Sequence, residues 1–131
     1  MDKYIKKFMK IHKTFRVRIT HNTVVQIVMF ATMLGNRNRI EEAKNMLYTL
    51  LEWTKNVVDF EVTKGEIYTR IGCLWLEENP QKARENLEEA RRLYLMRLPG
   101  DDKRIKELDG IMKGMALKSV KSETQVLRGG Q

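Results

Sequence analysis

The sequence has a single cysteine and two prolines, and aromatic residues make up only 8% of its 131 positions. One cysteine, Cys73, is too few for an internal disulfide bond or for a cysteine-rich zinc site. Long hydrophobic runs are missing too: the longest near the start, Ile27–Ala31, is far below the roughly 20 residues that a membrane-spanning helix needs. No apolar stretch typical of a secretion signal follows the basic start of the chain. We therefore expect an intracellular, cytoplasmic protein without a membrane span.

Apolar residues make up 42% of the sequence, and charged residues make up 32%. This apolar fraction is too high for a disordered segment, and the length suits one domain with one core. After Ser119 the sequence becomes polar and rich in glycine. We predict a single helical-hairpin domain over residues 1–118, which includes a basic segment over residues 1–40, and a polar tail over residues 119–131.

The positive charge is concentrated at the N-terminal end. The net charge is +8, and residues 1–40 hold nine basic residues and one acidic residue, whereas the remainder holds 16 of each. Such a segment is either a surface that contacts phosphate or an acidic partner, or a solvated cationic face. The candidate contacts to nucleic acid or to an acidic partner are Lys3, Lys6, Lys7, Lys10, Lys13, Arg16, Arg18, Arg37 and Arg39.

Most of the chain shows the spacing of amphipathic helices. The first predicted helix covers residues 3–13 and the last covers residues 102–118. Between them, Thr23, Asn38 and Thr63 each precede a Gln or Glu by three residues, which is the spacing of a helix-opening capping box. Two further helix starts are predicted, by Asn79 before Pro80 and by Asp101 or Asp102 after the Pro99-Gly100 break.

Two short segments have a different pattern, because apolar and polar residues alternate over residues 14–20 and again over residues 58–63. If the two segments paired as a small two-stranded element, Arg16 and Arg18 would meet Asp59 and Glu61 across the ladder. The other interpretation is two extended linkers, since an isolated two-stranded element is marginally stable.

The chain contains an internal repeat. The alternating segments and the pair Asn36 and Asn79 share an offset of 43 residues, and the offset of the following helices is 40. Each half therefore consists of an extended piece, a helix, a tight turn and a second helix. A helix pair repeated at about 40 residues is typical of stacked helical hairpins. We predict a mainly α fold of two stacked antiparallel hairpins with flanking N- and C-terminal helices.

The second hairpin resembles a tetratricopeptide repeat. The pattern of the family's first helix is matched by Tyr68, Ile71, Gly72 and Trp75, and that of its second helix by Ala83, Leu87 and Ala90. The resemblance implies that these residues pack the repeat, with Gly72 letting the two helices approach. The first hairpin has Ala31 where glycine is usual, the turn of the second is one residue short, and the closing proline is displaced to Pro99. The resemblance covers about residues 23–98.

No motif for catalysis or metal binding is present in the sequence. His12 and His21 lie nine residues apart with no ligand at a suitable spacing, and Cys73 is expected to be a small core residue. The glycines form no phosphate-binding loop. We therefore predict no enzyme activity, no cofactor and no metal.

A helix-turn-helix was also considered, because Ala31 and Gly35 have the spacing of that motif. Its recognition helix would cover residues 39–53 and would begin with Ile40, Glu41 and Glu42. A helix that reads the major groove needs basic or amide side chains at its N-terminal end, so this pattern disfavours sequence-specific DNA binding.

The repeat, together with the absence of a motif for catalysis or metal binding, predicts an interaction or assembly module. It would bind another protein, or a second copy of itself in a homo-oligomer, through a groove or an exposed apolar face. The alternative function is that of a nucleic-acid-binding accessory protein that uses the basic N-terminal segment. Phosphate contacts weaken steeply with salt, whereas an apolar groove does not, so the two functions are separable.

Overall fold

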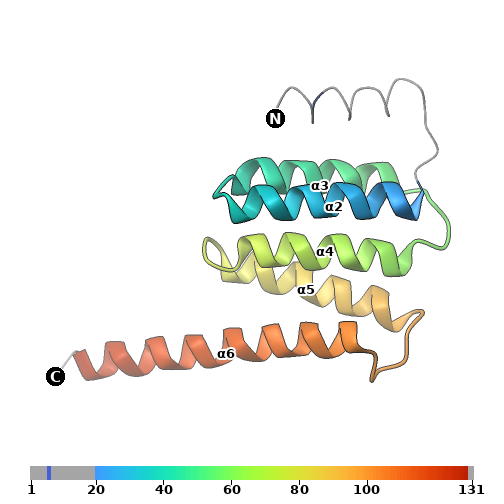
Figure 1. The fold of residues 1–131 in the computed structure, drawn as a ribbon. Coiled ribbons are helices and arrows are strands. Elements are labelled where there is room, and N and C mark those ends of the chain that lie inside the picture. The colour runs from blue at the N-terminus through green and yellow to red at the C-terminus, as the bar shows by residue number, and fades with distance from the viewer. Residues whose placement is uncertain (1–5, 7–19, 130–131) are drawn as a thin grey trace.

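The computed structural model describes Lys6 and residues 20–129. Five helices are described: α2 (His21–Asn36), α3 (Ile40–Thr54), α4 (Glu61–Trp75), α5 (Pro80–Leu95) and α6 (Lys103–Gly129). Helices α2 and α3 form one antiparallel hairpin, α4 and α5 form a second one stacked on it, and α6 packs on α5 (Figure 1). The predicted mainly α fold with hairpins is confirmed. The predicted helix over residues 3–13 lies outside the described residues, apart from Lys6.

The core of the first hairpin comes from apolar residues spaced three and four apart, which share one helix face. Each helix of this hairpin turns such a face toward the other. Ile67 and Ile71 of α4 join the same cluster, so the second hairpin is docked on the first by its own apolar stripe. The buried residues that α2 and α3 contribute to this cluster are Val24, Ile27, Ala31, Leu34, Ala43, Met46, Leu47 and Leu50.

Helices α4 and α5 approach each other closely because glycines lie at their contact. A Cβ atom on Gly72 would be 2.7 Å from Cγ of Leu87 and 3.2 Å from the carbonyl oxygen of Ala83. A Cβ atom on Gly65, two turns earlier, would be 2.5 Å from the ring of Tyr94. Both glycines are therefore required by close packing, although the sequence pattern singled out only Gly72.

The alternating segment over residues 58–63 is not a strand. Val58 is 79% exposed and Asp59 has a positive φ of 64°, so the chain turns here instead of extending. Helix α4 begins at Glu61, where the carbonyl of Phe60 accepts the first helical hydrogen bond from the amide of Lys64. No β-strand occurs among residues 20–129. The proposed partner, residues 14–20, lies outside the described residues except for Thr20.

Two helix starts are as predicted, and three are not. The side chain of Asn79 accepts a hydrogen bond from the amide of Lys82 and caps α5, and Asp102 accepts one from the amide of Arg104 at the start of α6. Thr23 and Thr63 lie inside helices, each two residues after the helix begins. Asn38 does not open α3 but ends α2.

Asn38 closes α2 in a Schellman motif. It has a φ of 61°, its amide donates to the carbonyl of Gly35, and the amide of Arg39 donates to the carbonyl of Leu34. These are the two hydrogen bonds that satisfy the last carbonyls of a helix, and they need a residue in the left-handed region. Asparagine tolerates this conformation, so Asn38 serves as the C-terminal cap of α2 and not as the N-terminal cap of α3.

Helix α6 covers the open side of α5 and continues well past it (Figure 1). Ile105 and Leu108 are fully buried against Leu87, Ala90 and Tyr94 in a second apolar cluster. We expected the last helix to end at residue 118 and a polar tail to follow over residues 119–131. Instead, α6 continues through most of this segment and ends at Gly129. This helix occupies the place that the first helix of a third hairpin would have.

Candidate binding groove

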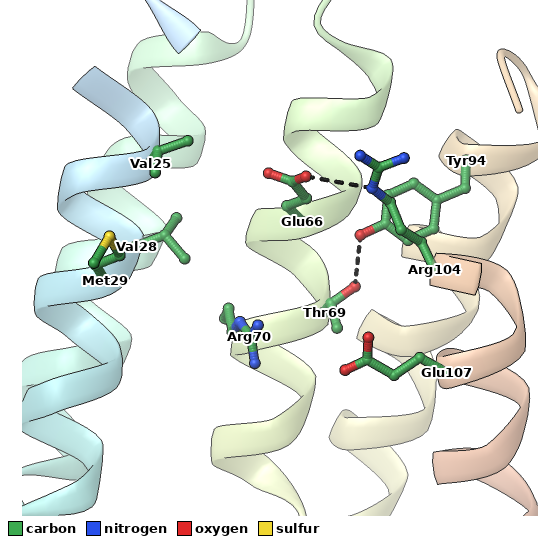
Figure 2. A pocket seen from close by; sticks show the side chains of 9 residues that line it. All are labelled: Val25, Val28, Met29, Glu66, Thr69, Arg70, Tyr94, Arg104 and Glu107. Carbon is green, nitrogen blue, oxygen red and sulfur yellow. Dashed lines mark hydrogen bonds and ion pairs between the residues drawn. The ribbon is translucent and has the colours of Figure 1, made fainter. Parts of the chain in front are cut away.

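A cavity of about 350 Å³ lies where α2, α4 and α6 face one another over Tyr94 of α5. The wall on α2 is apolar, and the opposite wall carries charged side chains from α4 and α6 (Figure 2). The spacing of the α2 residues places them on one helix face, next to the face that packs on α3. The lining residues are Val25, Val28, Met29, Glu66, Thr69, Arg70, Tyr94, Arg104 and Glu107.

A second cavity of about 410 Å³ continues along the same two helices toward the α2–α3 turn. Arg70 lines both cavities, so they meet at this side chain. We call the two cavities together the α2–α4 groove. It extends from Glu66 on α4 to Glu77 in the turn just after this helix, which is about 16 Å. The second cavity is lined by Thr32, Gly35, Asn36, Asn38, Ile40, Leu47, Arg70, Cys73, Leu74, Leu76 and Glu77.

Tyr94 forms the floor of the first cavity, and Gly65 makes room for its ring. The hydroxyl group of Tyr94 lies 3.3 Å from the hydroxyl of Thr69, which in turn donates a hydrogen bond of 2.8 Å to the carbonyl of Gly65. Burial raises the pKa of Tyr94, so its hydroxyl is neutral at physiological pH. The floor is therefore an uncharged polar surface that is held in place by two hydrogen bonds.

The charged side chains of the groove are only partly paired. Glu66 and Arg104 form an ion pair of 3.6 Å between α4 and α6. Arg70 and Glu107 have no ion pair or hydrogen bond within the part of the chain that the structure describes. Figure 2 shows Arg70 on the α4 wall without a bonded neighbour, whereas Glu66 one turn earlier is joined to Arg104. The first cavity thus offers one open cation and one open carboxylate to a ligand.

Cys73 lines the second cavity and is partly buried, close to its expected place as a small packing residue. Burial raises the pKa of its thiol above the usual 9.0 and outweighs the positive charge of Arg70, which acts to lower it. The reactive thiolate is therefore scarce at neutral pH, and this chemistry favours a packing residue over a nucleophile.

A separate polar cluster ties the hairpins together on another side of α4. The side chain of Lys44 is only 2% exposed, and its ammonium lies 2.7 Å from Glu41, 3.1 Å from Glu78 and 3.4 Å from the centre of the Trp75 ring. Burial lowers the pKa of Lys44, but the hydrogen bonds to the two carboxylates outweigh it and raise the pKa above 10.5. Lys44 is a permanent cation that joins α3 to the end of α4.

Most of the residues expected to pack the repeat lie in the two core clusters, the one shared with the first hairpin and the one shared with α6. Ile71, Ala83, Leu87 and Ala90 are fully buried, and Gly72 lies against Ala83 and Leu87. Tyr68 and Trp75 are partly buried, and the indole nitrogen of Trp75 donates to the hydroxyl of Tyr48.

Most of the expected phosphate-contacting residues are not described. Among those that are, Lys6 and Arg37 are exposed, and Arg39 is bound to Glu42 by hydrogen bonds from Nε and Nη2. None of these three residues lines either cavity of the groove. The residues outside the described part of the chain are Lys3, Lys7, Lys10, Lys13, Arg16 and Arg18.

Sequence reasoning missed both the groove and the lysine cluster. Arg70 and Glu66 have the spacing of an ordinary surface ion pair on one helix, and nothing local indicates that Arg104 competes for Glu66. A weak signal existed for Lys44, because it lies next to Ala43 and Met46 in the apolar stripe of α3. Its partners on the next hairpin are visible only in the folded chain.

No cluster of three or more His, Cys, Asp or Glu side chains in the described part of the chain is arranged to hold a metal ion. Among the described helices, none combines the length and the apolar character that crossing a bilayer requires. Comparison with models of protein families, with curated proteins and with solved structures gives no match.

Proposed function

We propose that this chain is a non-catalytic interaction module that binds a segment of another protein in the α2–α4 groove. The observation that carries the proposal is the pair of adjoining cavities, about 350 and 410 Å³, along one face of the stacked helices. Ligand sites are concave surfaces of this size, lined by apolar side chains with a few polar groups. An extended segment rises about 3.3 Å per residue, so about five residues span the 16 Å of the groove.

The lining suits a peptide because it combines an apolar wall with polar partners. Met29 is 63% exposed, and its unbranched thioether adapts to side chains of different shapes. Thr69 and Tyr94 supply hydroxyl groups on the other side. The resemblance to tetratricopeptide repeats supports the same proposal, since the groove faces are those of the first helix in each hairpin.

The test is selection of peptides on the full-length chain. We expect a displayed library of random peptides to yield binders whose affinity falls at least tenfold when Met29→Glu places a charge on the apolar wall. The matched control is Met96→Glu, because Met96 is 56% exposed and lies outside both cavities. Binders that are equally sensitive to both variants, or no binders at all, would contradict the groove as the binding site.

A second copy of the chain is the alternative partner, as a homo-oligomer. Sedimentation of the full chain at micromolar concentration measures this directly. Helix α6 carries three exposed lysines, Lys103, Lys106 and Lys113. Their positive charges oppose association of two copies through this helix. An oligomer that Met29→Glu dissociates would make a second copy the occupant of the groove.

Nucleic-acid binding is the alternative function, favoured by the excess of nine basic residues over one acidic residue in residues 1–40. It predicts binding of random RNA or DNA at about 50 mM salt and a loss of affinity when Lys6, Lys7, Lys10 and Lys13 become Gln. The slope of log affinity against log salt should shrink by about 0.7–0.9 for each phosphate contact removed. Absence of binding at low salt would exclude this function.

A further inference from the structure

We propose that the ligand of the α2–α4 groove carries one internal acidic side chain, which binds Arg70, next to an apolar side chain that packs on Met29. This inference rests on the proposed function and adds the chemistry of the partner. Three observations support it. Arg70 has no ion pair among the described residues, it borders both cavities, and Glu107 and the apolar wall of α2 line the first cavity with it.

Arg70 has no ion pair among the described residues because Arg104 of α6 binds its expected partner on α4. A glutamate four residues before an arginine on a helix normally pairs with it, and Glu66 holds that position. Glu66 instead pairs with Arg104 of α6 at 3.6 Å, as Figure 2 shows. The positions three and four residues after Arg70 are Cys73 and Leu74, which offer no carboxylate.

Other arginines of the described chain mostly have carboxylate partners. Arg37 and Arg84 also have none among the described residues, but neither lines either cavity of the groove. An unpaired guanidinium inside a groove is a site for a carboxylate, which it binds through two parallel hydrogen bonds. The arginines with a carboxylate partner are Arg39, Arg91, Arg92, Arg97 and Arg104.

The carboxylate comes from a side chain inside the ligand and not from a chain end. Arg70 borders both cavities, so a chain that ended there would leave one cavity of about 350 or 410 Å³ unfilled. A segment that passes through the groove fills both and presents a side chain to Arg70 at its middle.

Glu107 limits the ligand to one acidic side chain in the first cavity. Its carboxylate has no ion pair within the described chain and would repel a second acidic residue there. The neighbouring α2 wall of Val25, Val28 and Met29 favours an apolar side chain at the adjacent position. The predicted pattern is therefore an acidic residue with an apolar residue next to it, on either side along the chain, within a segment of about five residues.

The test uses the full-length chain and a library of seven-residue peptides with acetylated and amidated ends. The central position is fixed as Glu, Gln or Lys, the two positions before it or the two positions after it are apolar, and the others are random. We expect Glu peptides to be selected over Gln peptides, with affinities about tenfold higher, and this preference to weaken as salt rises. The preference should disappear in Arg70→Gln and reverse toward Lys peptides in Arg70→Glu.

The matched control is Arg84→Glu, which makes the same change in net charge outside both cavities. It should keep the Glu preference. Arg70 is exposed, and circular dichroism should confirm that its variants fold.

Three results would overturn the inference. Binders that depend on Met29 but show no preference for Glu would leave the proposed function intact and remove the role of Arg70. Peptides with a free C-terminus and no acidic side chain that bind more tightly would assign the carboxylate to a chain end. A library without any binder would remove the groove as a binding site and the inference with it.

Discussion

The ammonium group of Lys44 lies 3.4 Å from the centre of the Trp75 ring, and this contact joins the two hairpins. Lys44 belongs to α3, and Trp75 is the last residue of α4. The same ammonium binds Glu41 and Glu78, while the side chain of Lys82 lies 4.6 Å from the ring centre. The seam between the hairpins is thus held by a buried cation as well as by apolar contacts.

Truncation of Lys44 should destabilise the chain mainly through lost packing. Lys44→Ala removes buried methylene groups, which are worth about 0.8 kcal/mol each, and we expect a loss of about 2–3 kcal/mol. Lys44→Met restores most of the volume and should lie within about 1 kcal/mol of the wild type, because both carboxylate partners remain hydrated. Urea unfolding followed by tryptophan fluorescence measures both values. Equal losses in the two variants would show that the ion pairs dominate.

A methyl group at Gly72 should be harmful, although alanine favours a helix. Gly72→Ala gains about 1 kcal/mol of helix propensity, but the added atom would lie 2.7 Å from buried Leu87, and overpacking costs about 1–3 kcal/mol. We expect a lower melting temperature, and a still lower one for Gly72→Leu. The control is Gly110→Ala on α6, where nothing lies within 4 Å, and this variant should be stabilised by up to about 1 kcal/mol. An unchanged melting curve for Gly72→Leu would remove the close approach of α4 and α5.

Stability should fall at alkaline pH. Burial raises the pKa of Cys73 above its usual 9.0 and those of Tyr68 and Tyr94 above their usual 10.0. A raised pKa in the folded state gives stability that is complete below the unfolded value and is lost as pH rises through the folded value. The free energy of unfolding should therefore begin to fall above about pH 9. Tyr94→Phe should make this decline shallower, because the variant lacks one of these three groups.

Stability should also fall at acid pH, and Arg97 should control part of the loss. The carboxylate of Glu61 accepts a hydrogen bond from its own backbone amide and one from Arg97, and both lower its pKa below 4.5. A lowered pKa gives stability that is present above the unfolded value and is lost as pH falls through the folded value. Below about pH 4.5, Arg97→Gln should show a shallower decline than the wild type. Arg84→Gln, with no described partner, should follow the wild-type curve.

Several elements of the fold were predictable because their causes are local. The helical spacing of apolar residues marked each described helix, and Asn79 before Pro80 fixed the start of α5. Gly72 was also recognisable, since its place beside Ile71 in the repeat pattern implied a helix contact. The capping residues were less predictable, because Asn38 has both a helix-start and a helix-stop property and the hydrogen bonds around it decide between them.

The segment over residues 58–63 shows how tertiary contacts override a local pattern. Its alternation is that of a strand, yet Asp59 pairs with Arg97 at 2.9 Å and Phe60 packs against the first core cluster. Arg97 is 38 residues away in sequence, so no local pattern contains this contact. The turn is held on one side by Phe60, which packs on the first core cluster, and on the other by Asp59, which pairs with Arg97 just after α5.

The sequence by itself determined the helices, their pairing into hairpins and the close helix contact at Gly72, because these depend on spacing within about 40 residues. The tertiary structure alone decided which charged side chains are buried and which described ones have no ion pair. Lys44 is enclosed because α4 brings Trp75 and Glu78 to it, and Arg70 is open because α6 brings Arg104 to Glu66. Electrostatic partners are set by distance in space, and the chain order of their residues does not contain that distance.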